Sequence, residues 1–315
     1  TTVELSNEGH GFCCTAQGFP FPIPQNGLEV IWNHVMRYNT KGYRGHLNHA
    51  VTTPDGDYVV ERSYLELSYH YNHPDTTLAT LDNQNLWLMS KVVAPANKSG
   101  DNHLVHVPID RMAEDTGVWV FNPGLGRTRR IGEVGYDNPI FDGLLTHDQL
   151  DMFNGPLDRY SVTLIGKTEL YVPYNSYELY SPEHTYADIV TKGHINQSLT
   201  RYEKHRVWVI DTQVRDGYAH IYKRRRFYLD EDSWLVLSQE MYDEHNEFWR
   251  TAEAHAIMFQ NVPLIVNGIQ VHYDLQSRRY VIVNLTNEER EMIEYDWYKP
   301  KRHYKPRALK SFSLR

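Results

Sequence analysis

The chain has 315 residues, of which 41% are hydrophobic, 13% aromatic and 23% charged. Its 32 Lys and Arg against 40 Asp and Glu give a formal net charge of −8, which argues against a general nucleic-acid-binding protein because neutralising phosphates requires a basic surface. No run of about 18 apolar residues occurs, so the sequence contains no candidate transmembrane helix, and the length suits one large or two ordinary domains.

The first 24 residues show no regular pattern. They end in GFPFPIP (residues 18–24), where three prolines at alternate positions favour an extended path and exclude a helix. The two cysteines, Cys13 and Cys14, are adjacent, so a disulfide between them would close no useful loop. Such sparing use of cysteine fits the cytosol or the periplasm. Because the chain begins at Thr1 without a methionine, either a leader has been removed or the chain starts inside a longer protein.

Residues 26–38 carry the pattern of an amphipathic helix. Asn26 is a favoured N-cap residue, and the helix is expected to stop near Gly42. Its apolar stripe is broad enough to lie on a sheet, and the members of the stripe recur at helical spacing: Leu28, Ile31, Trp32, Val35 and Met36.

Beyond Gly45 the pattern is typical of strands. Thr146 is predicted to cap a short helix that runs through Phe153, and residues 174–200 show little periodicity, as lids and rims often do. Strands are predicted at residues 58–71, 86–93, 103–109, 117–122 and 162–172.

The following segment predicts an antiparallel meander. Blocks rich in β-branched and aromatic residues are separated by short turns of Asp, Asn and Gly, which force successive strands to pair antiparallel. A wide sheet with one aromatic face and no reactive motif suggests a surface that holds an apolar molecule. The blocks are residues 205–214, 219–229, 234–241 and 247–257.

Toward the C-terminus, strands are predicted at residues 269–275 and 280–283, and Thr286 with Glu289 forms a capping box for a final short helix. The sequence contains no internal repeat and no linker-like change in composition. We therefore expect a mainly β (α+β) protein organised as an irregular N-terminal segment, a single β-rich domain and a basic, extended C-terminal arm: residues 1–24, 25–297 and 298–315.

Motifs for catalysis or metal binding are absent from the sequence. Strand-borne histidines three residues apart face opposite sides of a sheet, so among the His pairs only His70 and His73, near a turn, are a candidate metal site. No His-Glu-x-x-His, Cys-x-x-Cys, nucleophile elbow, P-loop or dinucleotide fingerprint occurs. We expect no cofactor, although a pair of acids on distant strands, as in glycosidases, stays an alternative. Acidic pairs at predicted turns are explained by turn chemistry: Asp230 with Asp232, and Glu240 with Asp243.

The basic run at residues 223–226 alternates across a strand, so Lys223 and Arg225 face one side and Arg224 and Arg226 the other. An inward-facing arginine needs a carboxylate partner, for which Glu240 and Glu253 on neighbouring strands are candidates. The alternative is an arginine that grips an anionic lipid head group.

Eight segments resemble the bacterial family catalogued as domain of unknown function 1329. They occur in order over nearly the whole chain from Gly18 onward: GFPFPIPQNGLEVIWNH (18–34), VWVFNPGLGRTRRI (118–131), YDNP (136–139), DQLDMFNGPLDRY (148–160), YVPYNSYEL (171–179), RYEKHRVWVID (201–211), RRFYLDEDSW (225–234) and YDLQSRRY (273–280).

The resemblance implies an exported protein of Gram-negative bacteria, similar to outer-membrane lipoprotein-sorting proteins. It implies a large antiparallel sheet curled into an incomplete barrel whose concave side is covered by helices, and a periplasmic location or one at the periplasmic face of the outer membrane. Family members generally carry a signal peptide before the GFPFP segment. Relatives are often encoded near inner-membrane efflux-type transporters and outer-membrane proteins, which are therefore possible partners.

These observations favour a periplasmic carrier or chaperone for lipid-like or other hydrophobic molecules, without catalysis. The helix over the concave sheet should then make an apolar contact, with Glu29, Asn33 and Arg37 lying largely elsewhere. An interaction subunit that docks through the C-terminal tail and residues 174–200 is the alternative, and a hydrolase acting on a glycan or lipid is the second. The residues expected to line the cavity are Ile31, Trp32, Val35, Trp119, Phe121, Trp208 and Ile210.

Overall fold

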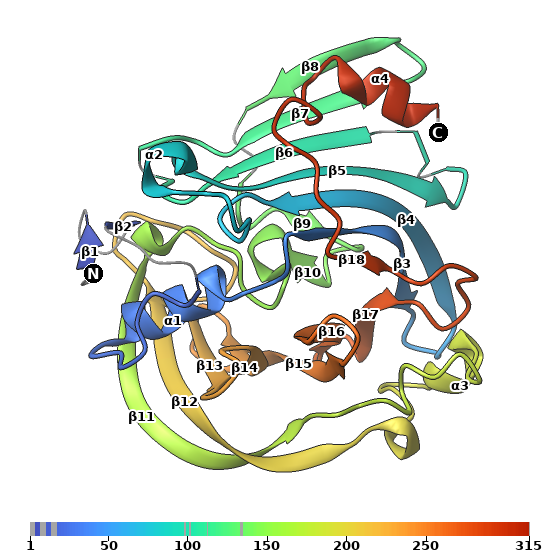
Figure 1. Cartoon of the computed structure of the whole chain (residues 1–315). Coiled ribbons are helices and arrows are strands. Elements are labelled where there is room, and N and C mark those ends of the chain that lie inside the picture. The colour runs from blue at the N-terminus through green and yellow to red at the C-terminus, as the bar shows by residue number, and fades with distance from the viewer. Residues whose placement is uncertain are drawn as a thin grey trace.

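Two antiparallel meanders join edge to edge into one large sheet. The computed structural model describes residues 4–6, 11–13, 18–97, 99–100, 102–111, 113–132 and 135–314. Within these residues, one sheet contains 14 strands, all of its neighbours are antiparallel, and its two edges, β11 and β8, do not pair. The expected open, curved antiparallel sheet is confirmed (Figure 1).

The order across the sheet places the C-terminal meander beside the N-terminal one. It runs β11 (Tyr160–Pro173), β12 (Tyr202–Val214), β13 (Arg224–Asp230), β14 (Val236–Tyr242), β15 (Phe248–Phe259), β16 (Leu264–Asp274), β17 (Arg279–Leu285), β3 (Gly42–Thr52), β4 (Tyr58–Tyr69), β5 (Gln84–Ala94), β6 (Asn102–Pro108), β7 (Gly117–Asn122) and β8 (Arg127–Ile131), with β18 (Glu294–Tyr295) pairing to β3. Two small pairs lie outside this sheet: β1 (Glu4–Ser6) with β2 (Gly11–Cys13), and β9 (Pro139–Ile140) with β10 (Leu145–Thr146).

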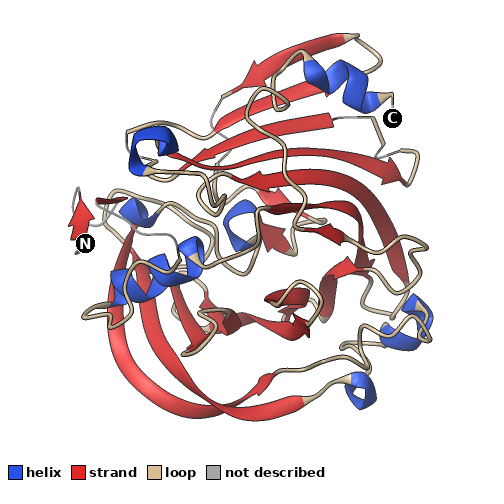
Figure 2. Ribbon diagram, in the orientation of Figure 1, coloured by secondary structure: helices blue, strands red, loops and turns tan. Residues whose placement is uncertain are grey.

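Short helical segments decorate the sheet (Figure 2). α1 (Gly27–Met36) is the longest described helix, with 10 residues, and none of the described helices is long and apolar enough to cross a bilayer. The others are α2 (Leu78–Leu81), α3 (Tyr186–Ile189), α4 (Ala308–Ser313) and the 3-10 turns η2 (His147–Gln149), η3 (Leu157–Arg159) and η4 (Gln197–Leu199).

The two faces of the sheet have different covers. Directly paired residues project to the same face, so the register aligns Ile210, Phe227, Gln239, Ala252 and His272 on the face that carries α1. This is the concave face, and residues 135–157, which we call the inner segment and which contain β9, β10 and η2, lie within its curve (Figure 1). α3 and α4 pack on the opposite face, each over its own apolar cluster.

Two predicted helices differ from the structure. Residues 286–291 form a turn and not a helix, because the carboxylate of Glu289 accepts hydrogen bonds from Arg62 and Asn48 instead of capping a backbone. The helix expected from Thr146 is only η2, because Asp151 and Met152 adopt left-handed backbone angles that end it.

The C-terminal segment, expected to be an extended arm, packs back on the sheet. Residues 299–314 contain α4, whose Leu309 and Phe312 are buried. The hydroxyl of Tyr304 lies 2.7 Å from that of Ser68 on β4. Its ring packs with Trp87 of β5. The aromatic residues of the tail therefore cover the domain's own core.

Candidate binding site on the concave face

α1 begins close against the edge of the sheet. The side-chain oxygen of Asn26 accepts a hydrogen bond from the backbone N–H of Glu29 at 3.0 Å, as an N-cap should. Gly27 permits the close approach, because a Cβ at this position would lie 2.8 Å from Cγ1 of Val162 and 3.1 Å from the backbone nitrogen of Leu164. The first turn of α1 therefore rests directly on β11.

The contact between α1 and the sheet is apolar along most of the helix. Ile31 is fully buried and Trp32 is 4% exposed, and both belong to one cluster with Ile210 of β12. The half-buried Trp208 packs against this cluster and stacks on Trp234, with the ring centroids 6.2 Å apart. Large apolar side chains thus form both sides of the contact.

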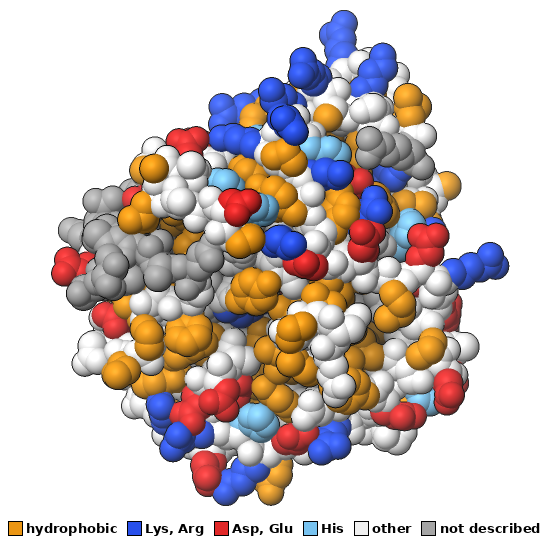
Figure 3. Space-filling view, viewed as in Figure 1, with side chains coloured by type: hydrophobic (Ala, Val, Ile, Leu, Met, Phe, Trp, Pro, Cys, Tyr) orange, Lys and Arg blue, Asp and Glu red, His pale blue; other side chains and the backbone are white. Residues whose placement is uncertain are grey.

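This apolar contact continues to the surface. Phe19, which is 43% exposed, lies with its ring centroid 5.6 Å from that of Trp234, and Ile23 is 80% exposed in the same lead-in to the helix. Nζ of Lys167 lies 4.2 Å from the centroid of the Trp208 ring. Hydrophobic side chains accordingly gather over α1 on the outside of the molecule (Figure 3), so an apolar molecule could reach the contact from solvent.

The C-terminal turn of α1 is held by polar contacts instead. Arg37 is 5% exposed, and its Nη2 lies 2.7 Å from both carboxylate oxygens of Asp151. His34 is fully buried, and its ring nitrogens each lie 3.0 Å from a carbonyl oxygen, one of Trp234 and one of Asp151. Burial, followed by the charge of Arg37, lowers the pKa of His34 to about 4, so this ring is neutral at pH 7.

The prediction that Asn33 and Arg37 lie away from the buried contact is wrong. Asn33 is fully buried, and its side chain accepts from the N–H of Phe21 at 2.8 Å and donates to the carbonyl of Phe21 at 2.6 Å. A helical pattern assigns polar residues to solvent. Here residues 18–25 fold back along the helix and the inner segment supplies Asp151, so both polar side chains find buried partners.

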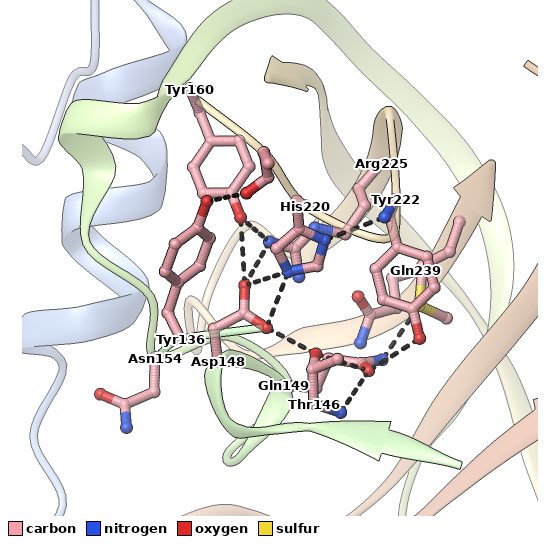
Figure 4. A network of polar contacts seen from close by, with 12 residues as sticks. Tyr136, Thr146, Asp148, Gln149, Asn154, Tyr160, His220, Tyr222, Arg225 and Gln239 are labelled. Atoms are coloured by element: carbon pink, nitrogen blue, oxygen red, sulfur yellow. Dashed lines mark hydrogen bonds and ion pairs between the residues drawn. The ribbon is translucent and has the colours of Figure 1, made fainter. Parts of the chain in front are cut away.

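A buried polar network lies deeper within the curve of the sheet (Figure 4). Asp148, 1% exposed, accepts hydrogen bonds from Arg225 at 2.5 Å, Thr146 at 2.6 Å and Tyr160 at 3.2 Å, with His220 at 3.4 Å. Burial alone would raise the pKa of the Asp148 carboxyl, but Arg225 and the hydrogen bonds from His220 and Thr146 hold it well below its usual range. The ion pair of Asp148 and Arg225 joins the inner segment to β13.

The concave floor beside this network carries polar atoms without partners. Within the described residues, neither ring nitrogen of His272 has a hydrogen-bond partner, nor do the side-chain oxygens of Gln239 and Gln270. The register places these side chains next to Ala252 and Ala254, which present only methyl groups. Burial, with a smaller effect of a nearby arginine, lowers the pKa of His272 to about 3, so the neutral ring offers one donor and one acceptor.

The seven residues predicted to line a cavity divide between the two faces. Trp119 and Phe121 of β7 pack under α4, on the face opposite α1, so they do not contribute to the α1 contact. The sequence shows which residues of one strand share a face. Whether residues of two distant strands lie on the same face of the sheet depends on the register of every strand pair between them. Five of the seven lie together beneath or on α1: Ile31, Trp32, Val35, Trp208 and Ile210.

The other candidate groups have structural roles. His70 stacks on Trp87, with ring centroids 4.9 Å apart, and His73 lies against Tyr298. No cluster of three or more potential metal ligands occurs in the described part of the chain. Asp230 is fully buried and accepts from Ser233 within its own turn.

Arg225 faces inward and binds a carboxylate, as expected of an inward-facing arginine, but the carboxylate is Asp148 and neither Glu240 nor Glu253. Glu240 accepts from two tyrosine hydroxyls and Glu253 from that of Tyr202. Sequence reasoning missed Asp148 because this residue comes from the inner segment and not from a strand next to β13. The buried arginine was the only signal that such a carboxylate must exist.

Solved structures share this fold. A protein of Desulfovibrio piger described as a DUF1329 family protein is 11% identical, with a TM-score of 0.57 over 86% of this chain and 92% of that one. A putative outer membrane lipoprotein-sorting protein domain from Vibrio parahaemolyticus is 12% identical, with a TM-score of 0.59 over 90% and 98%. A LolA superfamily protein from Nitrosomonas europaea is 9% identical, with a TM-score of 0.52 over 90% and 98%.

Sequence comparison gives the family directly. An uncharacterised protein of Pseudomonas aeruginosa is 38% identical over 317 residues, which cover all of this chain and 70% of that protein. The model of the family described as "Protein of unknown function (DUF1329)" matches residues 1–310. The chain therefore belongs to the DUF1329 family.

Proposed function

We propose that this protein is a periplasmic carrier that binds a lipid-like or other hydrophobic molecule between α1 and the concave face of β11 to β13, without chemical change. The observation that carries the proposal is the apolar contact of Ile31 and Trp32 with Trp208 and Ile210, which continues to the surface beside α1. The likeness in fold to a LolA superfamily protein and to a lipoprotein-sorting domain supports the envelope role and the location.

The two ends of α1 suggest how cargo would enter. The first turn touches β11 through Gly27, and in the described part of the chain no hydrogen bond joins the two, whereas Arg37 and His34 fix the last turn to the inner segment. Lifting the N-terminal half would strand no buried charge, because the ion pair with Asp151 stays closed. We propose that α1 pivots about this last turn.

The energetics of exchange favour such a mechanism. Opening the contact exposes apolar surface, and the hydrocarbon part of an inserted ligand covers it again. The favourable free energy is roughly 25 cal/mol per Å² of apolar area removed from water. The side-chain oxygens of Gln239 and Gln270 and the ring nitrogens of His272, which have no partner among the described residues, lie on the concave floor next to Ala252 and Ala254. They offer hydrogen bonds to a neutral polar head group of the ligand.

Two tryptophans, one on each face, provide a matched test. The protein is titrated with a dansyl-labelled fatty acid, and energy transfer from tryptophan reports binding. Trp208→Ala should weaken binding by about tenfold, since it removes a large apolar contact, whereas Trp119→Ala, which perturbs the face under α4, should change it less than about twofold. Native mass spectrometry of protein purified from its source should show bound lipid. Equal affinities of the two variants, or no binding by the wild type, would contradict the proposal.

A further inference from the structure

The sheet edge β8 and the helix α4 together form a basic end on an acidic protein. We define the basic end as Arg127, Arg129, Arg130, Lys305, Arg307 and Lys310, all of which are exposed. Because these six carry +6 and the whole chain −8, the remaining residues carry −14. Lys and Arg side chains gather over β8 and α4 in the space-filling view (Figure 3).

Contacts between the two segments, which are far apart in the sequence, hold this end together. Thr128 Oγ1 of β8 donates to the carbonyl oxygen of Pro306 at 3.5 Å, between Lys305 and Arg307. α4 packs through Phe312 in the same cluster as Phe121, which precedes the turn between β7 and β8. The cations of the tail therefore lie beside the edge strand, whose Arg130 is on the α4 face while Arg127 and Arg129 alternate to the other face of the same edge.

Internal ion pairs do not neutralise the cations of the basic end in the described part of the chain. Among the described residues, none of the six has a carboxylate oxygen within 4.0 Å, whereas Arg224 and Arg226 of β13 share Asp211. Arg130 has its guanidinium 5.5 Å from the centroid of the Trp119 ring. Six exposed cations without a carboxylate partner among the described residues leave a positive local field.

Exposed leucines lie beside these cations. Leu125, in the turn between β7 and β8, is 73% exposed, and Leu314, directly after α4, is 82% exposed. Since Phe312 and Phe121 pack together, the end of α4 and this turn lie at the same end of the sheet. Charges on an edge strand protect against aggregation, but that purpose explains neither the cations of α4 nor the leucines.

From this arrangement we propose that the basic end docks the protein on an anionic lipid surface. Phosphate groups of a leaflet attract Lys and Arg that are held near them, and apolar side chains among cations insert at the boundary between head groups and acyl chains. Cations spread over an edge strand and a helix match many mobile phosphates better than one ordered set of carboxylates. Because the anionic surface repels the rest of the molecule, which is negatively charged, the basic end would turn toward the membrane.

Vesicle co-sedimentation tests this docking. Wild-type protein should bind vesicles of phosphatidylglycerol and phosphatidylcholine, should ignore pure phosphatidylcholine, and should be released by high salt. Arg129→Gln with Arg307→Gln and Lys310→Gln should weaken binding at least about tenfold. The matched control replaces three exposed cations elsewhere, Lys192, Lys223 and Arg290, with Gln and should change binding less than about twofold.

Two outcomes would overturn the proposal. If the triple variant of the basic end binds anionic vesicles as the control does, the basic end is not the docking surface. If Leu125→Ser with Leu314→Ser leaves vesicle binding unchanged while polyglutamate displaces the protein fully, the surface fits an acidic protein instead. The proposal does not rest on carried cargo, and Trp208→Ala should bind vesicles like the wild type even if no cargo exists.

Discussion

Three buried histidines and the partly buried His49 make the stability of this protein sensitive to mild acid. Burial is the main cause that lowers the pKa of His34 and His49 to about 4 and that of His255 and His272 to about 3. An unfolded histidine has a pKa of about 6.5. Below that value the unfolded chain takes up protons that the folded protein refuses, so stability falls as the pH drops from about 6.5 toward the folded pKa values.

The magnitude follows from the linkage relation. Between pH 7 and pH 5, one histidine with a folded pKa of 3 to 4 loses about 1.9 kcal/mol of stability. The three buried ones together lose about 6 kcal/mol, comparable with the 5–15 kcal/mol that typically separates folded from unfolded states. We therefore expect the urea midpoint to fall steeply over this range.

His255→Phe isolates one of these protons. His255 is fully buried on β15, and neither of its ring nitrogens has a partner among the described residues, so an apolar ring of similar size should be tolerated at pH 7. At pH 5 the variant should be more stable than the wild type by about 2 kcal/mol.

The assay is urea unfolding followed by tryptophan fluorescence at both pH values. His245→Gln, at a side chain that is 75% exposed in the turn between β14 and β15, is the control and should leave the difference between the two pH values unchanged. The reasoning fails if His255→Phe loses as much stability on acidification as the wild type does.

Three further substitutions probe α1 and the network beneath it. Trp32→Ala should destabilise the cargo-free protein by about 3–5 kcal/mol in urea unfolding and should reduce co-purified lipid; full lipid retention would remove this ring from the proposed site. Gly27→Ala should push α1 away from β11 at about 1–3 kcal/mol and should speed uptake of the dansyl fatty acid in stopped flow, whereas Gly132→Ala, with open space around it, should do neither. Asp148→Asn leaves Arg225 without its anion and should cost about 3–5 kcal/mol at pH 7; because the folded pKa of Asp148 is depressed, that loss should shrink as the pH falls below about 4, and a pH-independent loss would contradict the ion-pair assignment.

Local pattern was sufficient for most strands and for the order of the meander, but it did not predict β8 or most of the short helical segments. The cap at Asn26 and the spacing from Leu28 predict where α1 begins, but α1 ends at Met36 and not near Gly42 as expected. The turn residues between 205 and 257 separate β12 to β15, although β13 begins at Arg224 and not at residue 219. The resemblance to lipoprotein-sorting proteins supplied the curved sheet. The helix cap, the helical spacing and the turns depend on residues that are neighbours in the chain, which is why they can be predicted from the sequence.

The candidate site could be predicted only in part. Trp208 and Ile210 were assigned correctly to one face of their strand, but Trp119 and Phe121 were grouped with them although nine strands intervene in the sheet order. Asp148 and Asp151 lie in an inner segment whose position no periodicity reports. Partners supplied across such distances are fixed by tertiary packing, which has no local signature.

The junction of the two meanders has a consequence for folding. β17 pairs with β3, and here Thr52 donates to the carbonyl oxygen of Tyr280, a residue 228 positions away. Hairpins within each meander close short loops, whereas this seam must close a very long one, and the entropy of closure rises with loop length. We infer that each meander pairs internally first and that the seam forms last, so a chain arrested before that step would expose the edges of β3 and β17 to pairing with other chains.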